Sequence, residues 1–287
     1  MPAPQTDQAM NASWESVGAL SPASLIGARL QLHHAAQIVN SAAISFLPAA
    51  ADDSHTNLEW LDDARVLASH LIPAPSPFHV GLSPEDFSIL IMNPNGSREA
   101  AFNLRGQSLH DAVGWLRDEV GQHGQDGALL TQEKHYTIPD HPVAHGAAFD
   151  ADAASLTECA HYWHDAAAML RAIASSTDGS SSVRCWPHHF DLATLVTLPD
   201  SRSIGTGMSL GDDSYAEPYF YVGPYPRPDT SALAPLPSGH WHTEGWTGAV
   251  LTASELTSVT GTAGHQHAIV HEFIQSATAI SRKALLG

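Results

Sequence analysis

Two short segments carry side chains that bind metals or move protons. The first is Val183–Leu198, VRCWPHHFDLATLVTL, in which His189 and Asp191 stand two residues apart. Residues at that spacing lie on one face of a β-strand, about 6–7 Å apart. An imidazole and a carboxylate so placed predict two metal ligands, or a histidine whose tautomer the aspartate fixes. A polar strand face turned toward solvent is the alternative.

The second segment is SGHWHTEGW, where His240, His242 and Glu244 alternate along a predicted strand. A His-x-His pair followed by a carboxylate is how jelly-roll metal enzymes present their ligands. Neighbouring strands lie about 4.8 Å apart, so both segments reach one ion if their strands are adjacent. The predicted metal ligands are therefore His189, Asp191, His240, His242 and Glu244. The solvated face of an antiparallel sheet is the competing interpretation.

Three or four of these side chains would bind one transition metal ion, zinc or iron, and leave Asp191 or Glu244 as a catalytic general base. This predicts a metal-dependent enzyme that hydrolyses or oxidises a small polar molecule. A non-catalytic domain that binds a small molecule or a protein is the alternative, and a structural domain with incidental histidines is a third possibility. No glycine-rich phosphate loop or dinucleotide fingerprint is present, so we expect no nucleotide cofactor.

A substrate pocket is predicted from two further groups of residues. Most of the tyrosines fall within eleven residues, and Tyr219, Tyr221 and Tyr225 recur in that stretch. The segment 128–152 lacks helical or strand periodicity and contains His141 and His145. Loops of that length inside a compact domain are uncommon and often functional. Core packing with hydroxyl groups at the rim is the alternative for the tyrosines.

Composition narrows the classes of partner. The chain of 287 residues has a formal charge of −18, which disfavours nucleic acids and membrane surfaces. It contains 19 histidines against 12 lysines and arginines, and these histidines are spread along the chain. No segment resembles a signal peptide or a membrane span, so a cytoplasmic protein is expected. Both cysteines are expected to be buried inert thiols, and nothing in the sequence indicates the oligomeric state.

The predicted elements must position these side chains. Helices are expected at 22–40, 108–122, 153–174 and 267–284, with about four strands after the first helix and about four after the third. Val183–Leu198 is predicted to be one central strand with Phe190, Leu192 and Val196 buried. The fold class is therefore α+β, with mainly antiparallel sheets packed against four long helices.

The order of these elements predicts two similar helix–sheet–helix halves, packed as one globular unit. A flexible tail is expected over residues 1–20, a first half over 21–127, a connecting loop over 128–152 and a second half over 153–287. The order helix, strands, helix occurs twice, over 21–123 and 153–285, which suggests an internal duplication as a hypothesis.

Several short motifs resemble an uncharacterised family, domain of unknown function 5996. They are FDLA at Phe190–Ala193, EPYFYVGPYPRP at Glu217–Pro228, QIVNSAAISFLP at Gln37–Pro48, and the loop IPDHPVAHGAAFDAD before the third helix. The elements keep the family's order over nearly the whole chain. The resemblance implies a fold and an order of elements, and it carries no activity.

Overall fold

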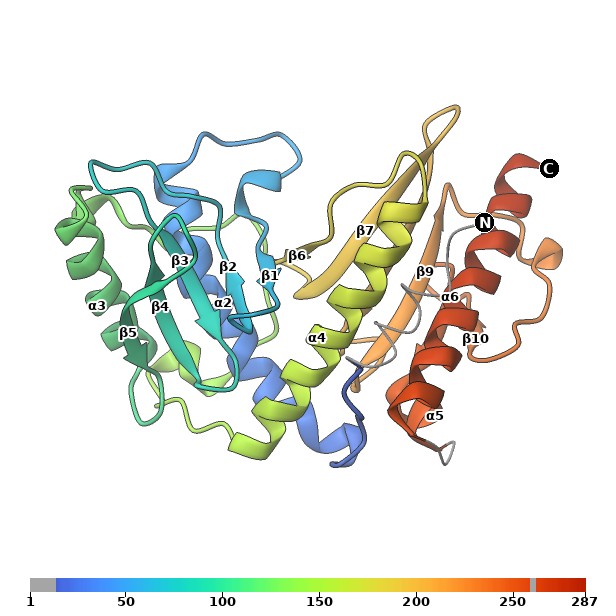
Figure 1. The fold of residues 1–287 in the computed structure, drawn as a ribbon, viewed down its shortest axis with the longest axis horizontal. Helices are drawn as coiled ribbons and strands as arrows, with labels where there is room; N and C mark the ends of the chain where they lie inside the picture. Colours follow the sequence, from blue (N-terminus) through green and yellow to red (C-terminus); the bar gives the residue numbers. More distant parts are fainter. Residues whose placement is uncertain (1–13, 259–261) are drawn as a thin grey trace. The chain divides into compact units, whose positions relative to one another are not determined.

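The computed structural model describes residues 14–258 and 262–287, which fold as two compact units (Figure 1). The α2 unit comprises residues 25–160 and 184–190. Of the described residues, the α6 unit comprises 14–24, 161–183, 191–258 and 262–287. The predicted division at residues 128–152 is therefore not the observed one, because that loop and residues 184–190 both belong to the α2 unit.

The 3-10 turn Pro22–Leu25 leads into helix α2 (Ile26–Phe46), the first helix of the α2 unit. An antiparallel meander follows in the order β1-β2-β3-β4-β5. Its strands are β1 (Glu59–Leu61), β2 (Val66–Ala68), β3 (His79–Ser83), β4 (Ser88–Met92) and β5 (Arg98–Asn103). Helix α2 packs on β3 and β4 and is buried along nearly its whole length.

Helix α2 extends six residues beyond the C-terminal end of the helix predicted at 22–40. The helix stops at Leu47, whose extended backbone precedes Pro48. A residue before proline is driven out of the helical region by the proline ring. Helix α3 (Leu109–Gln122) confirms the predicted helix at 108–122. It begins at a capping box in which Ser108 and Asp111 bond each other's backbone N–H groups.

Helix α4 (Ala153–Ser176) confirms the third predicted helix and continues from the α2 unit into the α6 unit. The sheet of the α6 unit has the order β10-β11-β9-β8-β7, with every neighbouring pair antiparallel. Its strands are β7 (Asp191–Leu198), β8 (Arg202–Ser209), β9 (Tyr219–Tyr225), β10 (His240–His242) and β11 (Gly248–Thr252). The short helix α5 (Ala253–Ser258) and helix α6 (Ala263–Leu286) complete the unit.

Helix α6 packs on β8, β9 and β11. The apolar side chains of β9, Phe220 and Val222, are buried together with Phe273 and Ile274 of α6. Tyr219 and Tyr221 alternate with them and therefore lie on the opposite face of the sheet. The sheet thus has an apolar face toward α6 and a second face that carries phenol groups.

Two antiparallel sheets and four long helices among the described residues confirm the α+β class. The hypothesis of a duplication is wrong, because the strand orders differ. The first sheet is a simple meander, whereas β10 of the second sheet lies outside β11. Among the described residues, no helix has the length and hydropathy needed to cross a membrane.

The predicted tail over residues 1–20 is only partly described, since residues 1–13 lie outside the described chain. Trp14 and Val17 are buried, and Val17 exchanges two hydrogen bonds with the side-chain amide of Gln266. The part of the tail from residue 14 onward is therefore packed on α6.

Residues 184–190 belong to the α2 unit although both flanking segments belong to the α6 unit. Within them lies the short strand β6 (Arg184–Trp186), where Cys185 exchanges two backbone hydrogen bonds of 2.8 Å with Leu58. The carbonyl oxygen of Pro187 accepts a hydrogen bond of 2.9 Å from Nε2 of His33. These bonds fix the segment on α2 and on the residue before β1.

Candidate functional site

The strand predicted over Val183–Leu198 is interrupted by a turn, so that part of the prediction is wrong. The N–H groups of His189 and Phe190 both bond to the carbonyl oxygen of Trp186. Phe190 has φ 57°, a left-handed conformation that strands do not contain. The turn places His189 in the α2 unit and starts β7 at Asp191 in the α6 unit, so the two side chains do not share a strand face. The predicted burial of Phe190, Leu192 and Val196 is confirmed.

The order of the second sheet separates the other predicted ligands. Asp191 begins β7, and His240 and His242 form the ends of β10. Strands β8, β9 and β11 lie between them, so four steps of about 4.8 Å place the two strands roughly 19 Å apart. The predicted convergence of Asp191 with His240, His242 and Glu244 on one ion is therefore wrong.

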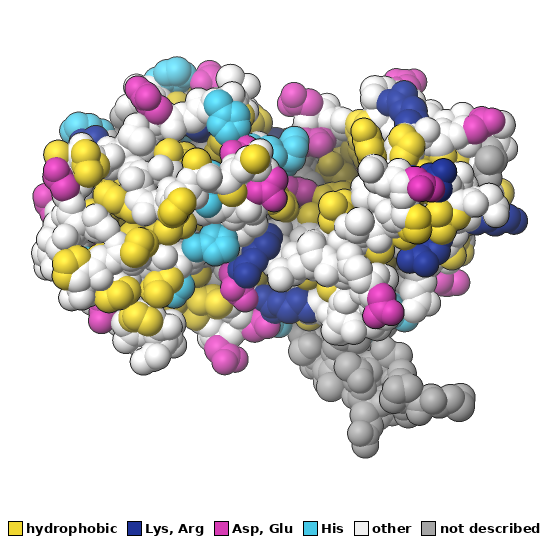
Figure 2. All heavy atoms as spheres, turned by 90° about the horizontal axis from the view of Figure 1, so that it is seen from above, with side chains coloured by type: hydrophobic (Ala, Val, Ile, Leu, Met, Phe, Trp, Pro, Cys, Tyr) yellow, Lys and Arg dark blue, Asp and Glu magenta, His cyan; other side chains and the backbone are white. Residues whose placement is uncertain are grey.

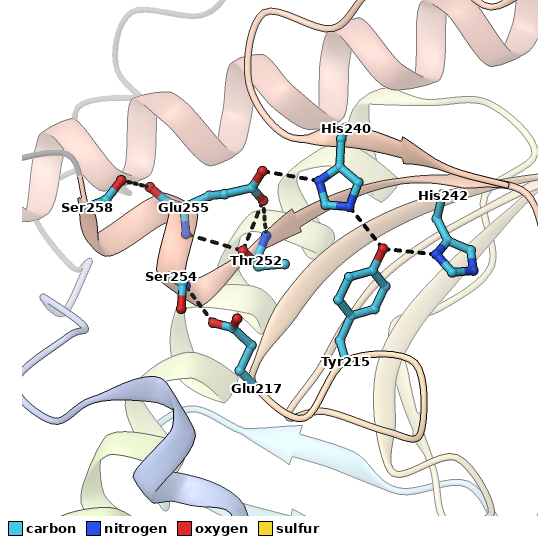
Figure 3. A network of polar contacts seen from close by, with 8 residues as sticks. All are labelled: Tyr215, Glu217, His240, His242, Thr252, Ser254, Glu255 and Ser258. Atoms are coloured by element: carbon cyan, nitrogen blue, oxygen red, sulfur yellow. Dashed lines mark hydrogen bonds and ion pairs between the residues drawn. The ribbon is translucent and has the colours of Figure 1, made fainter. Parts of the chain in front are cut away.

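Tyr215, which was not a predicted ligand, contacts both histidines of β10. Its hydroxyl oxygen lies 2.9 Å from Nε2 of His240 and 3.0 Å from Nδ1 of His242 (Figure 3). The two histidines project from the same face of β10, and Tyr215 stands on the loop between β8 and β9. We call these three residues the Tyr215 centre. All of it lies within the α6 unit.

Glu255 fixes the orientation of His240. One carboxylate oxygen lies 3.1 Å from Nδ1 of His240, and the other accepts hydrogen bonds from the N–H and the hydroxyl of Thr252 (Figure 3). The backbone N–H of Glu255 in turn bonds to the Thr252 hydroxyl at 3.2 Å. This is a capping box at the start of α5, and it leaves one oxygen for the imidazole.

His242 is held by a backbone group and by an aromatic ring. Its Nε2 bonds to the carbonyl oxygen of Glu244, and its ring stacks on Trp246 with centroids 4.4 Å apart and planes at 28°. Glu244, predicted as a ligand or base through its carboxylate, thus meets His242 through its backbone. The imidazole cannot rotate without losing both contacts.

The hydrogen atoms of the Tyr215 centre can be counted. A carbonyl oxygen only accepts, so His242 carries a proton on Nε2, and the Glu255 carboxylate places a proton on Nδ1 of His240. In neutral imidazoles with these tautomers, the nitrogens that face Tyr215 carry lone pairs. The hydroxyl supplies one proton for two contacts. In one of the two nitrogen–oxygen contacts, a lone pair therefore faces another lone pair. A further cation at the centre, either a proton or a metal ion, would remove this repulsion.

The phenol of Tyr215 keeps its proton in the metal-free protein. Partial burial, followed by the charges of Glu255 and Asp212, raises the pKa of Tyr215. Asp212 also shapes the loop, since one of its oxygens accepts the N–H groups of Ser214 and Tyr215 at 2.8 and 3.0 Å. The position of the phenol is thus set by its own loop as well as by the imidazoles.

The tyrosines predicted to line a substrate pocket differ in their surroundings. The hydroxyl of Tyr219 donates to Asp212 at 2.7 Å, and the hydroxyl of Tyr221 donates to Asp191. Burial and the carboxylates raise the pKa of both phenols. Tyr225 is 65% exposed. Tyr219 and Tyr221 therefore extend the polar network of the Tyr215 centre across the sheet.

His141 and His145, the other predicted pocket residues, lie in the α2 unit. Nδ1 of His141 accepts the N–H of Val143 at the start of a short 3-10 turn, and His145 bonds to Asp140 at 2.7 Å. A pocket shared with the tyrosines stays a prediction. Figure 2 shows several histidine side chains on the visible surface of the protein.

Within residues 14–258 and 262–287, no group of three or more His, Cys, Asp or Glu side chains is arranged to hold a metal ion. The Tyr215 centre is of a different kind, because a phenol supplies the third donor. Sequence reasoning missed Glu255, although the spacing of Thr252 and Glu255 after an apolar strand is a capping-box signal. It grouped Tyr215 with the other tyrosines, since only the fold brings it to β10.

Comparisons with known proteins give no information about the family or the function of this chain. No family model matches the chain, and neither the curated proteins nor the solved structures contain a significant match. The resemblance to domain of unknown function 5996 stays a prediction.

Proposed function

We propose that Tyr215, His240 and His242 bind one transition metal ion, and that the protein is a metal-dependent enzyme acting on a small polar molecule. The observation that supports this most strongly is the shortage of protons at the Tyr215 centre. Three donor atoms face one another across 2.9 and 3.0 Å, and they share one proton when both imidazoles are neutral. A metal ion between them would turn this repulsion into coordination.

The spacing of the donor atoms suits a metal. Two ligands bound at about 2.1 Å to one ion are separated by about 3.0 Å when they lie at right angles, as in an octahedral site, and by about 3.4 Å at the tetrahedral angle that zinc prefers. The remaining ring nitrogens bond to a carboxylate and to a backbone carbonyl, which are the usual partners of metal-binding imidazoles. Two nitrogens and one phenolic oxygen form a donor set suited to iron, copper or zinc.

Three protein ligands leave coordination positions for water or substrate. The side chains of His240 and Glu255 are 44% and 40% exposed, so small molecules have access to the centre. The carboxylates of Glu255 and Asp212 make anionic substrates unfavourable, and a neutral or cationic polar molecule fits best. A zinc ion would favour hydrolysis through bound water, whereas iron or copper would also allow oxidation.

Metal content and ligand variants test the proposal on the full chain. We expect about one ion per chain after reconstitution with Zn²⁺, Fe²⁺ or Cu²⁺, measured by elemental analysis after gel filtration. His240→Ala and His242→Ala should abolish binding with unchanged far-UV circular dichroism. Tyr215→Phe should weaken binding and remove the visible phenolate charge-transfer band of the iron or copper form. His265→Ala, an exposed residue on α6, is the matched control.

The competing occupant of the Tyr215 centre is a proton on one imidazole. In that case the reconstituted wild-type chain retains no ion after gel filtration, or retains the same amount in the His240→Ala and His242→Ala variants. Either result would contradict the metal proposal.

A further inference from the structure

Three phenols form a row that starts at the Tyr215 centre. The ring centroids of Tyr215 and Tyr219 are 5.1 Å apart, and those of Tyr219 and Tyr221 are 6.1 Å apart. Tyr219 and Tyr221 are two residues apart on β9 and therefore share a sheet face. The row leads from β10, across β9, toward β7.

Each phenol in the row has its own proton acceptor. The Tyr215 hydroxyl contacts the two imidazoles, Tyr219 donates to Asp212, and Tyr221 donates to Asp191. A phenol that loses an electron becomes a strong acid, so its oxidation is reversible only when a base receives the proton and later returns it. Tyr219 and Tyr221 meet this requirement with or without a metal ion. Tyr215 meets it through the imidazoles when no metal ion is bound, and as a metal-bound phenolate it has no proton to release.

A glycine leaves room for the ring of Tyr221, the last phenol of the row. Gly207 on β8 is paired with Tyr221, and a Cβ atom there would lie 2.6 Å from both Cζ and the hydroxyl oxygen of Tyr221. The ring therefore lies across the bare backbone of β8 and reaches Asp191 on β7. Any larger residue at 207 would displace it.

We infer that Tyr215, Tyr219 and Tyr221 form a path for single electrons between the metal centre and Asp191, which gives the protein a one-electron redox function. This inference rests on the proposed metal centre. Packing of buried phenols with satisfied hydroxyl groups is the alternative, and it requires no transfer of charge along the row.

The reaction balances with hydrogen peroxide as the oxidant. Peroxide takes two electrons and two solvent protons and yields two molecules of water. One electron would come from the reduced metal ion, which ends one oxidation state higher, and one from the metal-bound Tyr215 phenolate, which carries no proton to release. An electron from Tyr219 then refills Tyr215, and an electron from Tyr221 refills Tyr219. Asp212 holds the Tyr219 proton during its step, and Asp191 keeps the Tyr221 proton, so the products are a neutral Tyr221 phenoxyl radical and a protonated Asp191.

Rapid-freeze electron paramagnetic resonance tests the path in the full chain loaded with Fe²⁺ after addition of peroxide. We expect a phenoxyl radical in the wild-type chain whose spectrum changes in Tyr221→Phe. Tyr219→Phe should lower its yield several-fold, and so should Asp191→Asn, which keeps the shape of the side chain but removes the base. Tyr225→Phe, an exposed tyrosine on the same strand, should leave the radical unchanged.

A second arm separates the electron path from the metal centre. In the metal-free chain, flash-photolysed ruthenium tris-bipyridine with persulfate oxidises tyrosine directly, and Tyr219→Phe should again lower the yield of the Tyr221 radical. A chain that binds metal but gives the same radical in Tyr219→Phe, or no radical, overturns the path alone. A chain that binds no metal yet shows the effect of Tyr219→Phe under photo-oxidation overturns the metal centre alone.

Discussion

Glu255 and His240 are joined at 3.1 Å through the carboxylate oxygen that is not used to cap helix α5. The same side chain therefore starts a helix and fixes the tautomer of an imidazole on the neighbouring strand β10. Residues that hold the second nitrogen of a metal-binding histidine set both its orientation and its basicity. Mutation can therefore separate the contribution of Glu255 to the start of helix α5 from its contribution to the orientation of His240.

Glu255→Ala should weaken metal binding by about 10–100-fold, because His240 loses the acceptor for its Nδ1 proton. It should also cost about 1 kcal/mol of stability, since the capping box of α5 is lost. Thr252→Ala is the matched control, because it removes the hydroxyl of the cap and leaves the contact between Glu255 and His240. Competition with a chelator measures the affinity, and urea unfolding measures the stability. Equal loss of affinity in both variants would show that the cap alone matters.

The stability of the α2 unit should fall in mild acid because of His33. Its ring is buried on α2, stacks on Phe190 with centroids 4.8 Å apart, and donates to the carbonyl oxygen of Pro187. Burial lowers the pKa of His33 from 6.5 to about 4. The hydrogen bond to Pro187 opposes this, and the nearby His34, Arg29 and His189 add to it.

The folded state thus favours neutral His33, and the unfolded state binds more protons between pH 6.5 and about 4. The contribution of His33 to the free energy of unfolding is complete above pH 6.5, decreases as the pH falls, and is lost below about pH 4. From neutral pH to about pH 5 the expected loss is about 2 kcal/mol. His33→Gln keeps a donor and should flatten this dependence in urea unfolding, whereas His110→Gln, at an exposed position, should not. A wild-type chain equally stable at both pH values would refute the assignment.

Gly207 and Gly223 lie on the same sheet face and should respond differently to alanine. A Cβ atom at Gly207 would lie 2.6 Å from Tyr221 and from the carbonyl oxygen of Leu192, whereas at Gly223 it meets nothing within 4 Å. Gly207→Ala should therefore cost about 1–3 kcal/mol. Gly223→Ala should be neutral or stabilising by less than about 1 kcal/mol. Equal unfolding free energies for the two variants would mean that Tyr221 does not lie across β8.

Local sequence patterns were sufficient to predict several helices and buried residues. Ser108 and Asp111 predict the start of α3, because a capping box depends only on residues three apart. The long apolar periodicity from residue 153 predicts α4 for the same local reason. The buried face of Phe190, Leu192 and Val196 was also correct, since burial follows hydrophobicity even where the backbone turns between them.

Both wrong predictions about the site concern contacts between residues that are far apart in the sequence. The pattern around His189 and Asp191 is that of a strand. Bonds to α2 and to the residue before β1 instead hold residues 184–190 in the α2 unit, where residues 187–190 form a turn. A left-handed Phe190 costs about 1–2 kcal/mol, which only tertiary contacts can offset. The residue types and their spacing alone predicted that His240, His242 and the tyrosines lie on strands. They also predicted that these histidines have side chains suited to binding metals. Only the order of the strands decided that His240 and His242 meet Tyr215 and not Asp191, because hydrogen bonding between strands depends on the path of the whole chain.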